Sequence, residues 1–375
     1  MNLSFTAQTP IIESFRVRQT RGLFDLPEER TAKVEFQAEL PETSDDWQIG
    51  AIVGPSGSGK STVARTAYGE SIVARQEWPT DRAVIDALPK GPIKHVTGML
   101  SSVGFSSPPG WLKPYHVLST GEQFRCDLAA AVLSDQMLIV FDEFTSVVDR
   151  TAAQIGSAAV AHAVREANKR QKRTDFQKFV AVTCHYDVLP WLQPDWVLDM
   201  ADGTLTRGRL RRPDIEITIH SARQSAWSAF ARHHYLSGKL NPAAVCYLAT
   251  WHGEPVAFCG VLNSIGHVGL RRISRLVVLP DYQGVGIGGR FMDAIGEIYA
   301  DAGDRLRITT SHPAIIARLR TSSQWVVTSI RRGGSNWGAF AKRKKIHSTS
   351  FGRTVVSAEY VAGAKEMAKG EATRG

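Results

Sequence analysis

The sequence predicts an α/β chain of two domains, each with a glycine-rich loop that runs from a strand into a helix. Its 375 residues exceed what one hydrophobic core usually supports. The loops are GPSGSGKST at 54–62 and LPDYQGVGIGGR at 279–290. Glycine-rich turns before a helix bind phosphate groups, because bare N–H groups and the helix dipole face the anion. The two loops differ in sequence, so we expect them to bind different phosphate groups.

Composition and charge indicate a globular protein with an anionic partner. Hydrophobic residues make up 43% of the chain and charged residues 22%, which is ordinary for a globular protein. The net charge of +9 favours a polyanion. We see no signal-peptide pattern in MNLSFTAQTPIIESF and no apolar run near the ~20 residues of a membrane span. The four cysteines form no C-x-x-C pair, which indicates reduced thiols. We therefore expect a soluble, cytoplasmic protein with no membrane partner.

The polar stretch ADGTLTRGRLRRPD at 201–214 divides the chain. Before it, the strand-like runs QIGAIVG, MLIVFDE and FVAVTCH alternate with helical patterns, which predicts a mostly parallel sheet covered by helices. After it, we expect five strands and helices at 221–236, 288–302 and 312–321. The predicted parts are a first domain at 1–205, a linker at 206–214, a second domain at 215–345, and a C-terminal strand with a flexible tail at 346–375.

The first loop fits the pattern G-x-x-x-x-G-K-[ST] in the required context, after the strand GAIV and before the helix KSTVARTAY. In such loops backbone N–H groups surround the phosphates, the lysine reaches the β- and γ-phosphates, and the serine binds Mg²⁺. This pattern predicts an ATP site. Its candidate residues in the loop are Gly54, Gly57, Ser58, Gly59, Lys60, Ser61 and Thr62.

A second part of the ATP site is predicted at 137–143, where the apolar strand MLIVFDE ends in two carboxylates. Asp142 would hold Mg²⁺, and Glu143 would polarise the attacking water. An apolar strand that ends in Asp-Glu is common by itself. Here it follows LSTGEQ at 118–123, and the combination is much more specific.

LSTGEQ resembles LSGGQ, the signature sequence of ABC-type ATPases, and the resemblance covers roughly residues 10–205. The chain departs from the signature at Thr120 and Glu122. The resemblance implies a head-to-tail homodimer with ATP between the subunits. The segment between the Q-loop and the signature is short for a transporter, which favours a soluble ABC ATPase. The residues implied by resemblance are Gln76 of the Q-loop as an Mg²⁺ ligand, Ser119 and Gly121 at the γ-phosphate, Asp149 of the D-loop, and His185 as the switch histidine.

The second loop fits [QR]-x-x-G-x-[GA] at Gln283, Gly286 and Gly288. A dinucleotide fingerprint is the rival, but it belongs in the first strand–helix unit and needs a carboxylate for the ribose. This loop follows the fourth predicted strand of its block instead. The arrangement resembles the GNAT acyltransferases over about 213–340, which implies binding of the coenzyme A pyrophosphate by the loop and of pantetheine by the strand before it. The implied residues are Val277, Val278, Gln283, Gly284, Val285, Gly286, Ile287 and Gly288.

Two clusters could supply the chemistry of acyl transfer. His234 and Tyr235 lie in RHHYLSGKL at 232–240, where substrates approach in this fold, and Ser311 and His312 lie in TTSHP, where the fifth strand ends. A solvated or capping role competes for the histidines, a core role for the tyrosine, and a helix N-cap before Pro313 for the Ser-His pair. HHYLSG resembles a stretch of phage Mom-type enzymes that modify adenine in DNA. A metal on His233, His234 or Tyr235 stays open.

Charge near the C-terminus predicts a nucleic-acid partner. No Asp or Glu occurs from Arg305 to Ala358. Basic and aromatic side chains together can follow a phosphate backbone and stack on bases. A solvated face, or a clamp for the 3′-phosphate of coenzyme A, is the alternative. The residues are Arg305, Arg307, Arg318, Arg320, Arg331, Arg332, Lys342, Arg343, Lys344, Lys345 and Arg353, with Trp325, Trp337, Phe340 and Phe351 between them.

The hypothesis is a soluble ABC-type ATPase fused to a GNAT acyltransferase that acts on a nucleic acid. Its cofactors would be ATP, Mg²⁺ and acetyl-CoA or another acyl-CoA. A base amine that accepts the acyl group would have to leave the base stack first. One alternative is a regulatory or DNA-surveillance ATPase whose GNAT-like part only binds a ligand. The other is a transport ATPase.

Overall fold

The computed structural model describes residues 2–10, 12–25, 31–72, 77–134, 136–170, 176–234, 239–332 and 354–362. The chain forms two compact units. The first unit contains Met1–Ala74, Gln136–Ser146 and Ala167–Arg211. The second contains Arg75–Asp135, Val147–Glu166 and Arg212–Gly375. The helical segment of the predicted first domain therefore groups with the C-terminal part of the chain, a division that the polar stretch at 201–214 did not indicate.

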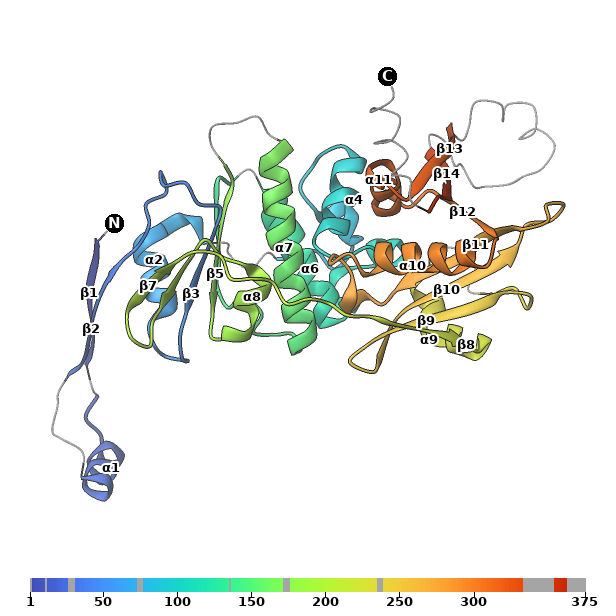
Figure 1. Cartoon of the computed structure of the whole chain (residues 1–375). Helices are drawn as coiled ribbons and strands as arrows, with labels where there is room; N and C mark the ends of the chain where they lie inside the picture. The colour runs from blue at the N-terminus through green and yellow to red at the C-terminus, as the bar shows by residue number, and fades with distance from the viewer. Residues whose placement is uncertain are drawn as a thin grey trace. The chain divides into compact units, whose positions relative to one another are not determined.

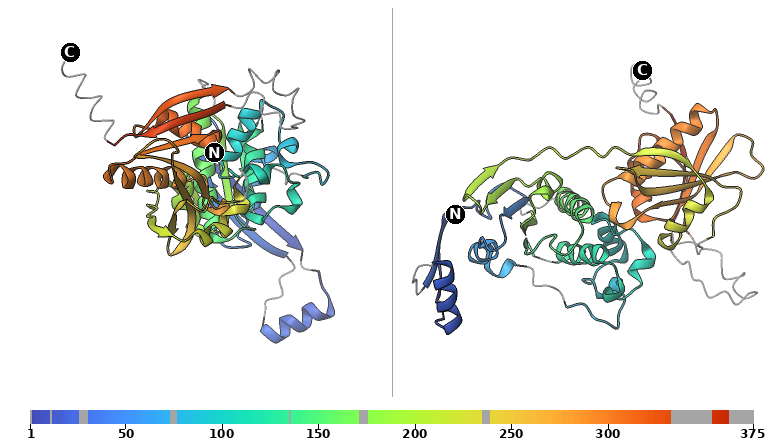
Figure 2. Two further views of the ribbon diagram at one scale, coloured as in Figure 1. Left: turned by 90° about the vertical axis from the view of Figure 1, so that its right-hand side faces the viewer. Right: turned by 90° about the horizontal axis from the view of Figure 1, so that it is seen from below.

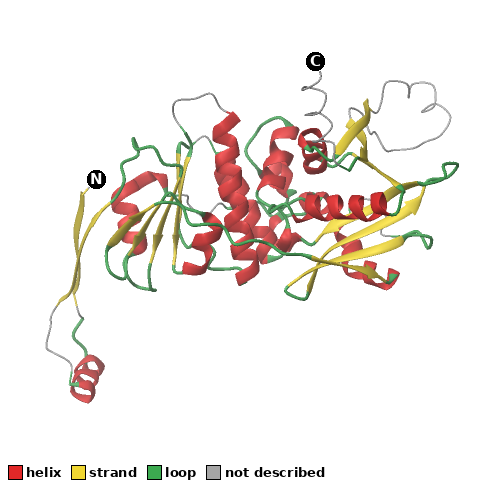
Figure 3. Ribbon diagram, viewed as in Figure 1, coloured by secondary structure: helices red, strands yellow, loops and turns green. Residues whose placement is uncertain are grey.

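The first unit is built on a five-stranded sheet of order β4-β5-β3-β6-β7 (Figure 3). The first four strands run parallel, and β7 pairs antiparallel with β6 at the edge. The central strand β3 is buried at every position, as a strand covered on both faces should be. The strands are β3 (Ile49–Val53), β4 (Leu138–Phe141), β5 (Lys178–Thr183), β6 (Trp196–Asp199) and β7 (Thr204–Arg207).

Helices and one hairpin complete the first unit. Strand β7 lies in the stretch that we predicted as a boundary turn or linker, so that expectation is wrong for Thr204–Arg207, which pair with β6. The remaining elements are β1 (Asn2–Pro10), α1 (Phe15–Phe24), β2 (Thr31–Glu39), α2 (Lys60–Tyr68), η1 (Gly69–Ser71), η3 (Tyr186–Val188) and α8 (Leu189–Leu192). Strands β1 and β2 form an antiparallel pair of their own.

The second unit contains a seven-stranded sheet of order β13-β14-β12-β11-β10-β9-β8 (Figure 2). Only the β11–β12 pair is parallel. The strands are β8 (Thr218–Ala222), β9 (Val245–Trp251), β10 (Glu254–Asn263), β11 (Leu270–Val278), β12 (Arg305–Thr310), β13 (Trp325–Arg332) and β14 (Thr354–Tyr360). The five predicted strands correspond to β8 to β12. The predicted α/β fold class is confirmed in both parts of the chain.

Helices cover both faces of this sheet. Figure 1 shows α10 (Ile287–Asp301) along one face, and its buried residues Phe291, Ile295 and Tyr299 recur at helical spacing. On the other face Trp227 and Phe230 pack with strand residues such as Phe258. The helix expected at 221–236 is broken into three short turns, because only Trp227 and Phe230 of those turns are buried. These turns are η4 (Gln224–Ala226), α9 (Trp227–Phe230) and η5 (Ala231–His233).

The helical segment of the second unit precedes the sheet in sequence and packs against it. Helix α4 packs against α11, and α6 packs against η6, the turn that leads to the second loop (Figure 1). The helices of this segment are α3 (Val84–Ala87), α4 (Ile93–Ser102), α5 (Pro108–Trp111), η2 (Tyr115–Val117), α6 (Thr120–Leu133) and α7 (Arg150–Arg170). The elements that they contact between the strands of the sheet are η6 (Pro280–Tyr282) and α11 (Pro313–Thr321). Within the described ranges, none of the helices has the length and apolar composition that a bilayer-spanning segment requires.

Strand β14 lies inside the sheet, between β12 and β13, beyond the boundary expected at 345. We predict that a chain ending at residue 345 loses stability, because it lacks the buried side chains of Val356 and Ala358 and both ladders of β14. The expected loss is about 10 °C or more in Tm, or failure to fold. Calorimetry of the shortened and full chains measures this. A chain ending at residue 362 is the control and should melt with the full chain; equal melting of all three would contradict the prediction.

Candidate functional site

The first loop joins β3 to α2 with the backbone that a phosphate cradle needs. Gly59 precedes α2 with φ of 87°, in the left-handed region that favours glycine. A Cβ at Gly54 would lie 2.7 Å from Cβ of Met200. The N–H groups at the start of α2 have no partner within the helix. This backbone suits the phosphate site predicted at Gly54, Gly57, Ser58, Gly59 and Thr62, which stays a prediction.

Lys60, Ser61 and Asp142 come together at this loop. The Lys60 ammonium donates to the carbonyl oxygens of Gly54 and Pro55 at 2.9 and 2.7 Å. The Ser61 hydroxyl donates to Oδ1 of Asp142 at 2.9 Å, across 81 positions of sequence. A hydroxyl and a carboxylate side by side are hard oxygen ligands that fit Mg²⁺. When bound, Mg²⁺ would neutralise phosphate charge. Gln76, the third predicted ligand, lies outside the described residues.

The residues after Asp142 adopt a strained backbone. Glu143 and Thr145 have φ of 54° and 68°, a conformation that costs energy for residues with a Cβ and occurs often at functional sites. Glu143 is exposed, and its N–H donates to Oδ1 of Asp142 at 2.9 Å. The Thr145 hydroxyl lies 3.1 Å from Nδ1 of His185, and the His185 N–H donates to Oγ1 of Thr183. The two threonines position the predicted switch histidine, and no sequence pattern indicated them.

The signature segment begins α6 in the second unit. The Ser119 hydroxyl accepts from the Glu122 N–H, and the Glu122 carboxylate accepts from the Ser119 N–H at 3.0 Å. This is a capping box, so Glu122, a departure from LSGGQ, fixes the serine that the resemblance places at the γ-phosphate. A Cβ at Gly121 would lie 2.8 Å from Oδ1 of Asp281. Asp149, the D-loop candidate, accepts from the Ala152 N–H at 2.9 Å at the start of α7.

The second loop joins β11 to α10 and is anchored by Gln283. Its Nε2 donates to the carbonyl oxygen of Val278 at 2.7 Å, and its Oε1 accepts from the Ser106 N–H at 2.5 Å. Gly284 and Gly286 both have φ of 89°. Gly286 is exposed and precedes the first turn of α10, whose N–H groups suit a pyrophosphate. No lysine follows these glycines in the loop, so it can hold a phosphate but has no equivalent of Lys60.

Strands β11 and β12 separate beside this loop. They pair from Leu270 to Ile273 on β11, after which β11 continues to Val278 without β12. Val277 and Val278 pair on their other side with β10. A cavity of about 470 Å³ lies at the point of separation and contacts Ile273, Ser274 and Thr309. Its charged lining is entirely basic: Lys239, Arg272 and Arg275.

Ser311 and His312 follow β12 next to this separation. His312 is the N-cap residue of α11, but its side chain does not cap the helix. Its Nε2 lies 2.8 Å from the carbonyl oxygen of Ser106. A carbonyl only accepts, so Nε2 carries the proton and Nδ1 is the basic nitrogen. Burial lowers the pKa of His312, and the bond to Ser106 opposes this.

The histidines after α9 have structural contacts. His234 is buried, with its ring 5.7 Å from that of Trp227 in an edge-on arrangement, so the solvated alternative does not hold for this histidine. Nε2 of His233 accepts from Arg232 at 3.0 Å. Burial and Arg232 lower the pKa of His233. Tyr235 lies outside the described residues. No three His, Cys, Asp or Glu side chains gather as a metal site in the described part of the chain.

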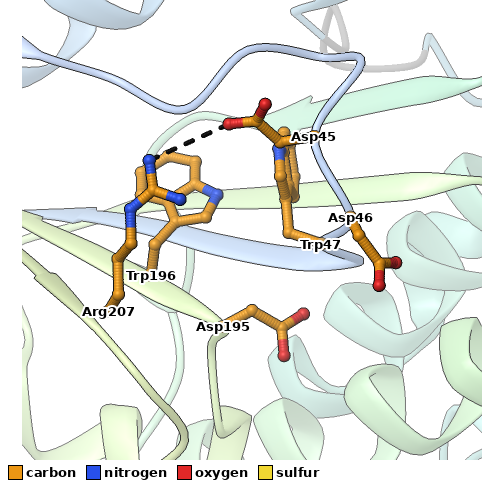
Figure 4. Close-up of a pocket in the computed structure, with 6 residues that line it drawn as sticks. All are labelled: Asp45, Asp46, Trp47, Asp195, Trp196 and Arg207. Carbon is orange, nitrogen blue, oxygen red and sulfur yellow. Dashed lines mark ion pairs between the residues drawn. The ribbon is translucent and has the colours of Figure 1, made fainter.

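A hollow of about 550 Å³ in the first unit is lined by three aspartates, Trp47, Trp196 and Arg207 (Figure 4). Its carboxylates have structural partners. Asp195 accepts from the N–H groups of Gln48 and Ile49, and Asp45 accepts from the Glu42 N–H and pairs with Arg207 at 3.8 Å. The hollow lies at the start of β3 and β6, at the opposite strand ends from the ATP loop. We therefore do not assign it to the ATP site.

Residues 242–319 match the family model described as an acetyltransferase (GNAT) domain. The GNAT resemblance predicted from LPDYQGVGIGGR is thus confirmed over these residues. No curated protein sequence matches the chain. The match covers only the first part of the basic stretch, up to residue 319, and excludes the helical segment, so the remaining parts are interpreted from their own contacts.

Solved structures resemble separate parts of the chain. The ribosomal-protein-S18-alanine N-acetyltransferase from Escherichia coli has 18% identity and a TM-score of 0.30, covering 40% of this chain and 97% of that one. A Bacillus subtilis acetyltransferase in complex with CoA has 14% identity and a TM-score of 0.30, with 39% and 98% covered. A dimeric ATP-binding cassette bound to ADP and Pi has 16% identity and a TM-score of 0.36, with 50% and 95% covered.

The basic stretch of the GNAT domain is partly neutralised. Arg305 and Arg307 pair with Glu359, which follows the acid-free stretch directly, and Arg318 pairs with Asp293. Trp325 is buried and donates to Asp293 at 2.9 Å, so the expectation that it stacks on bases is wrong. Arg320 and Arg331 are exposed. The other predicted members beyond Arg332 lie outside the described residues: Trp337, Phe340, Lys342, Arg343, Lys344, Lys345, Phe351 and Arg353.

Neutralising Glu122 should strengthen ATP binding. In E122Q the glutamine can still complete the capping box, but a negative charge near the implied γ-phosphate is gone. Removing such a like charge is worth about 1 kcal/mol, so the KM for ATP should fall about threefold to tenfold. Phosphate release at varied ATP concentration measures this. E254Q, at an exposed glutamate of the GNAT domain, should leave the KM unchanged. An unchanged or higher KM for E122Q would contradict the placement of the phosphate.

The burial of His312 predicts a pH-dependent stability. Its folded-state pKa lies below the unfolded value of about 6.5. The stability that comes from burying a neutral His312 is fully present above that pH. It is lost as pH falls, because the unfolded chain then binds the proton more readily than the folded chain. In H312Q the Tm should therefore fall less steeply between pH 7 and pH 5. H95Q, at an exposed histidine of α4, is the control. Identical slopes for H312Q and the unmutated chain would refute this.

Proposed function

We propose that the chain hydrolyses ATP and couples this reaction to acyl transfer from acyl-CoA to an amine of a nucleic acid base. The observation that carries the proposal is the pair of phosphate loops with different surroundings. In the first, Lys60 donates to carbonyl oxygens of the loop, and Ser61 donates to Asp142. The second has no lysine and leads from separating strands. One loop suits a phosphate that is cleaved, and the other suits the pyrophosphate of a donor.

For ATP hydrolysis, Lys60 and the loop N–H groups would hold the phosphates, and Ser61 and Asp142 would hold Mg²⁺. Glu143 would orient the water that attacks the γ-phosphorus, yielding ADP and phosphate. His185, held by Thr145, would contact the γ-phosphate. In the proposal Ser119 and Gly121 of a second copy complete the site, so the working form is a homodimer. We expect this homodimer to act in the cytoplasm.

For acyl transfer, Gln283 to Gly288 would bind the coenzyme A pyrophosphate, and the edge of β11 at Val277 and Val278 would face pantetheine. The acceptor nitrogen attacks the thioester carbonyl carbon, the C–N bond forms, the C–S bond breaks, and coenzyme A leaves. In the proposal Nδ1 of His312 would take the amine proton, which would then reach the leaving thiolate. Ser311 would offer its hydroxyl beside the reacting carbonyl. Acetyl-CoA is the donor that we propose first.

The basic cavity supports a phosphate-bearing acceptor. Arg275 is held by the carbonyl oxygens of Ser274 and Lys239 and lies 6.0 Å from the ring of Trp227. Arg272 is exposed and lies in the part of β11 that pairs with β12, one residue before that pairing ends. Among the residues that the structure describes, no acidic side chain lines the cavity, and the net charge of the chain is +9. A polyanion gains affinity from such charges. The partial resemblance of HHYLSG to Mom-type enzymes points to the same class of acceptor.

Transfer of labelled acetyl groups tests the proposal. The full chain is incubated with [¹⁴C]acetyl-CoA, ATP and Mg²⁺, together with single-stranded DNA, duplex DNA, RNA or a protein extract. We expect label in a nucleoside after digestion, at a rate that falls as salt rises. R272A should raise the KM for the acceptor about fivefold to tenfold, because a lost phosphate contact is worth about 1 kcal/mol. R16A, which removes an exposed arginine of α1, is the control.

Three outcomes would contradict parts of the proposal. Label only in protein would refute the nucleic-acid acceptor. Acetyl-CoA binding without transfer to any acceptor would favour a ligand-binding GNAT domain on a regulatory ATPase. A K60A variant that still releases phosphate at the unmutated rate would refute the ATP site.

A further inference from the structure

The helical segment of the second unit contacts the backbone of the loop that we propose to bind acyl-CoA. This loop, Gln283 to Gly288, is here called the acyl-CoA loop. The contact is made by residues 103–107, here called the α4–α5 loop, because they join those two helices. The Ser106 N–H donates to Oε1 of Gln283 at 2.5 Å. The same glutamine binds the carbonyl oxygen of Val278. Gln283 thus connects the strand before the acyl-CoA loop to the helical segment.

Two glycines let the chains approach this closely. A Cβ on Gly284 would lie 2.8 Å from both Cα of Gly104 and Cβ of Ala159. A Cβ on Gly104 would lie 2.7 Å from the carbonyl oxygen of Gln283. Real Cβ atoms do not occur at such separations from backbone atoms, since packed interiors leave no free space. A movement of the α4–α5 loop toward the acyl-CoA loop would therefore have to displace that loop.

A buried ion pair connects the signature helix to the same loop. Arg125 on α6 has no solvent exposure, and its Nη1 lies 3.3 Å from Oδ1 of Asp281 and 3.2 Å from the carbonyl oxygen of Gly121. Burial lowers the pKa of Arg125, and Asp281 opposes this effect. A buried arginine without its carboxylate is strongly unfavourable. Gly121 and Asp281 must therefore stay close to the same guanidinium.

The helical segment also contacts the part of the proposed acyl-transfer site where the acceptor would bind. Nε2 of His312 binds the carbonyl oxygen of Ser106, and the Ser107 hydroxyl donates to the carbonyl oxygen of His233 at 3.3 Å. Helix α4 also packs against α11, which begins directly after His312. An interface that only stabilised the unit could use any part of the GNAT surface. This one contacts Gln283 and His312, which belong to the proposed site.

We propose that Arg125 and Ser106 are positioning residues of the acyl-CoA site, through which nucleotide at the signature sets the affinity for acyl-CoA. The inference rests on the proposed function, because it needs ATP at Ser119 and Gly121 and acyl-CoA at Gln283 to Gly288. ATP that engages the signature restrains the start of α6, and Arg125 transmits the restraint to Asp281, two residues before Gln283. A loop that is already ordered loses less entropy when it binds, so ATP increases acyl-CoA affinity. Linkage requires acyl-CoA to increase ATP affinity by the same factor.

Calorimetry of the full chain tests the coupling. The E143Q background prevents hydrolysis, and acetyl-CoA is titrated without nucleotide, with ADP–Mg²⁺ and with ATP–Mg²⁺. We expect the Kd for acetyl-CoA to be at least fivefold lower with ATP than without nucleotide, within the range of measured coupling. The reverse titration of ATP, with and without acetyl-CoA, should give the same factor. Unequal factors in the two directions would mean that the signal is not coupled binding.

Variants locate the coupling in the ion pair. D281N should reduce the coupling factor, which is the ratio of the acetyl-CoA Kd without nucleotide to that with ATP, to about one. Acetyl-CoA should still bind. E359Q removes another carboxylate that pairs with arginines in the same sheet and should retain the full factor. If D281N fails to fold, the double variant R125M/D281A removes both charges and leaves neither buried alone. Hydrogen exchange of the E143Q chain needs no change at the interface, and ATP–Mg²⁺ should slow exchange in residues 281–288.

The outcomes separate this inference from the proposed function. Acetyl-CoA binding with one Kd in all nucleotide states overturns the coupling and leaves the acyl-CoA site standing. An absence of acetyl-CoA binding in every state overturns the proposed acyl transfer and the coupling with it. A full coupling factor in a folded D281N or R125M/D281A chain overturns the role of Arg125. Loss of coupling in E359Q as well would show that any lost carboxylate has this effect, and would also overturn that role.

Discussion

A fully buried arginine connects two parts of the second unit. Asp281 provides the carboxylate that pairs with Arg125 and opposes the cost of its burial, and Asp281 belongs to the turn before the acyl-CoA loop. The same guanidinium binds the carbonyl oxygen of Gly121. A Cβ at 121 would lie 2.8 Å from Oδ1 of Asp281, so that carboxylate would have to move aside. The ion pair therefore connects the turn before the loop to the start of α6.

The two phosphate loops show how similar backbones are suited to different chemistry. Both place glycines with positive φ before a helix and present N–H groups to an anion. Only the first has a lysine bonded to its own carbonyl oxygens and a serine bonded to a carboxylate. Only the second follows a strand whose parallel neighbour has separated from it. The side chains around a loop, and the sheet behind it, decide whether a phosphate is cleaved or held.

Local features of both sites could be predicted from the sequence because they depend on neighbouring residues. The strands before the loops, the helices after them, and the carboxylates that end β4 are short-range patterns. The capping box between Ser119 and Glu122 was also visible as S-x-x-E, although we treated Glu122 only as a departure from the signature. Thr145 was not foreseen, because its contact with His185 joins two loops 40 positions apart.

The sequence by itself determined the two phosphate loops, the α/β class and the excess of positive charge, since each follows from residue type and near spacing. Only the tertiary structure decided which charges are neutralised and which chain segments pack together. Trp325 was expected to stack on bases, yet strand order buries it against Asp293. Arg305 meets Glu359 because β12 and β14 are neighbours. Likewise, the α4–α5 loop reaches Gln283 across 177 positions of sequence, because two glycines remove the side chains that would keep the backbones apart.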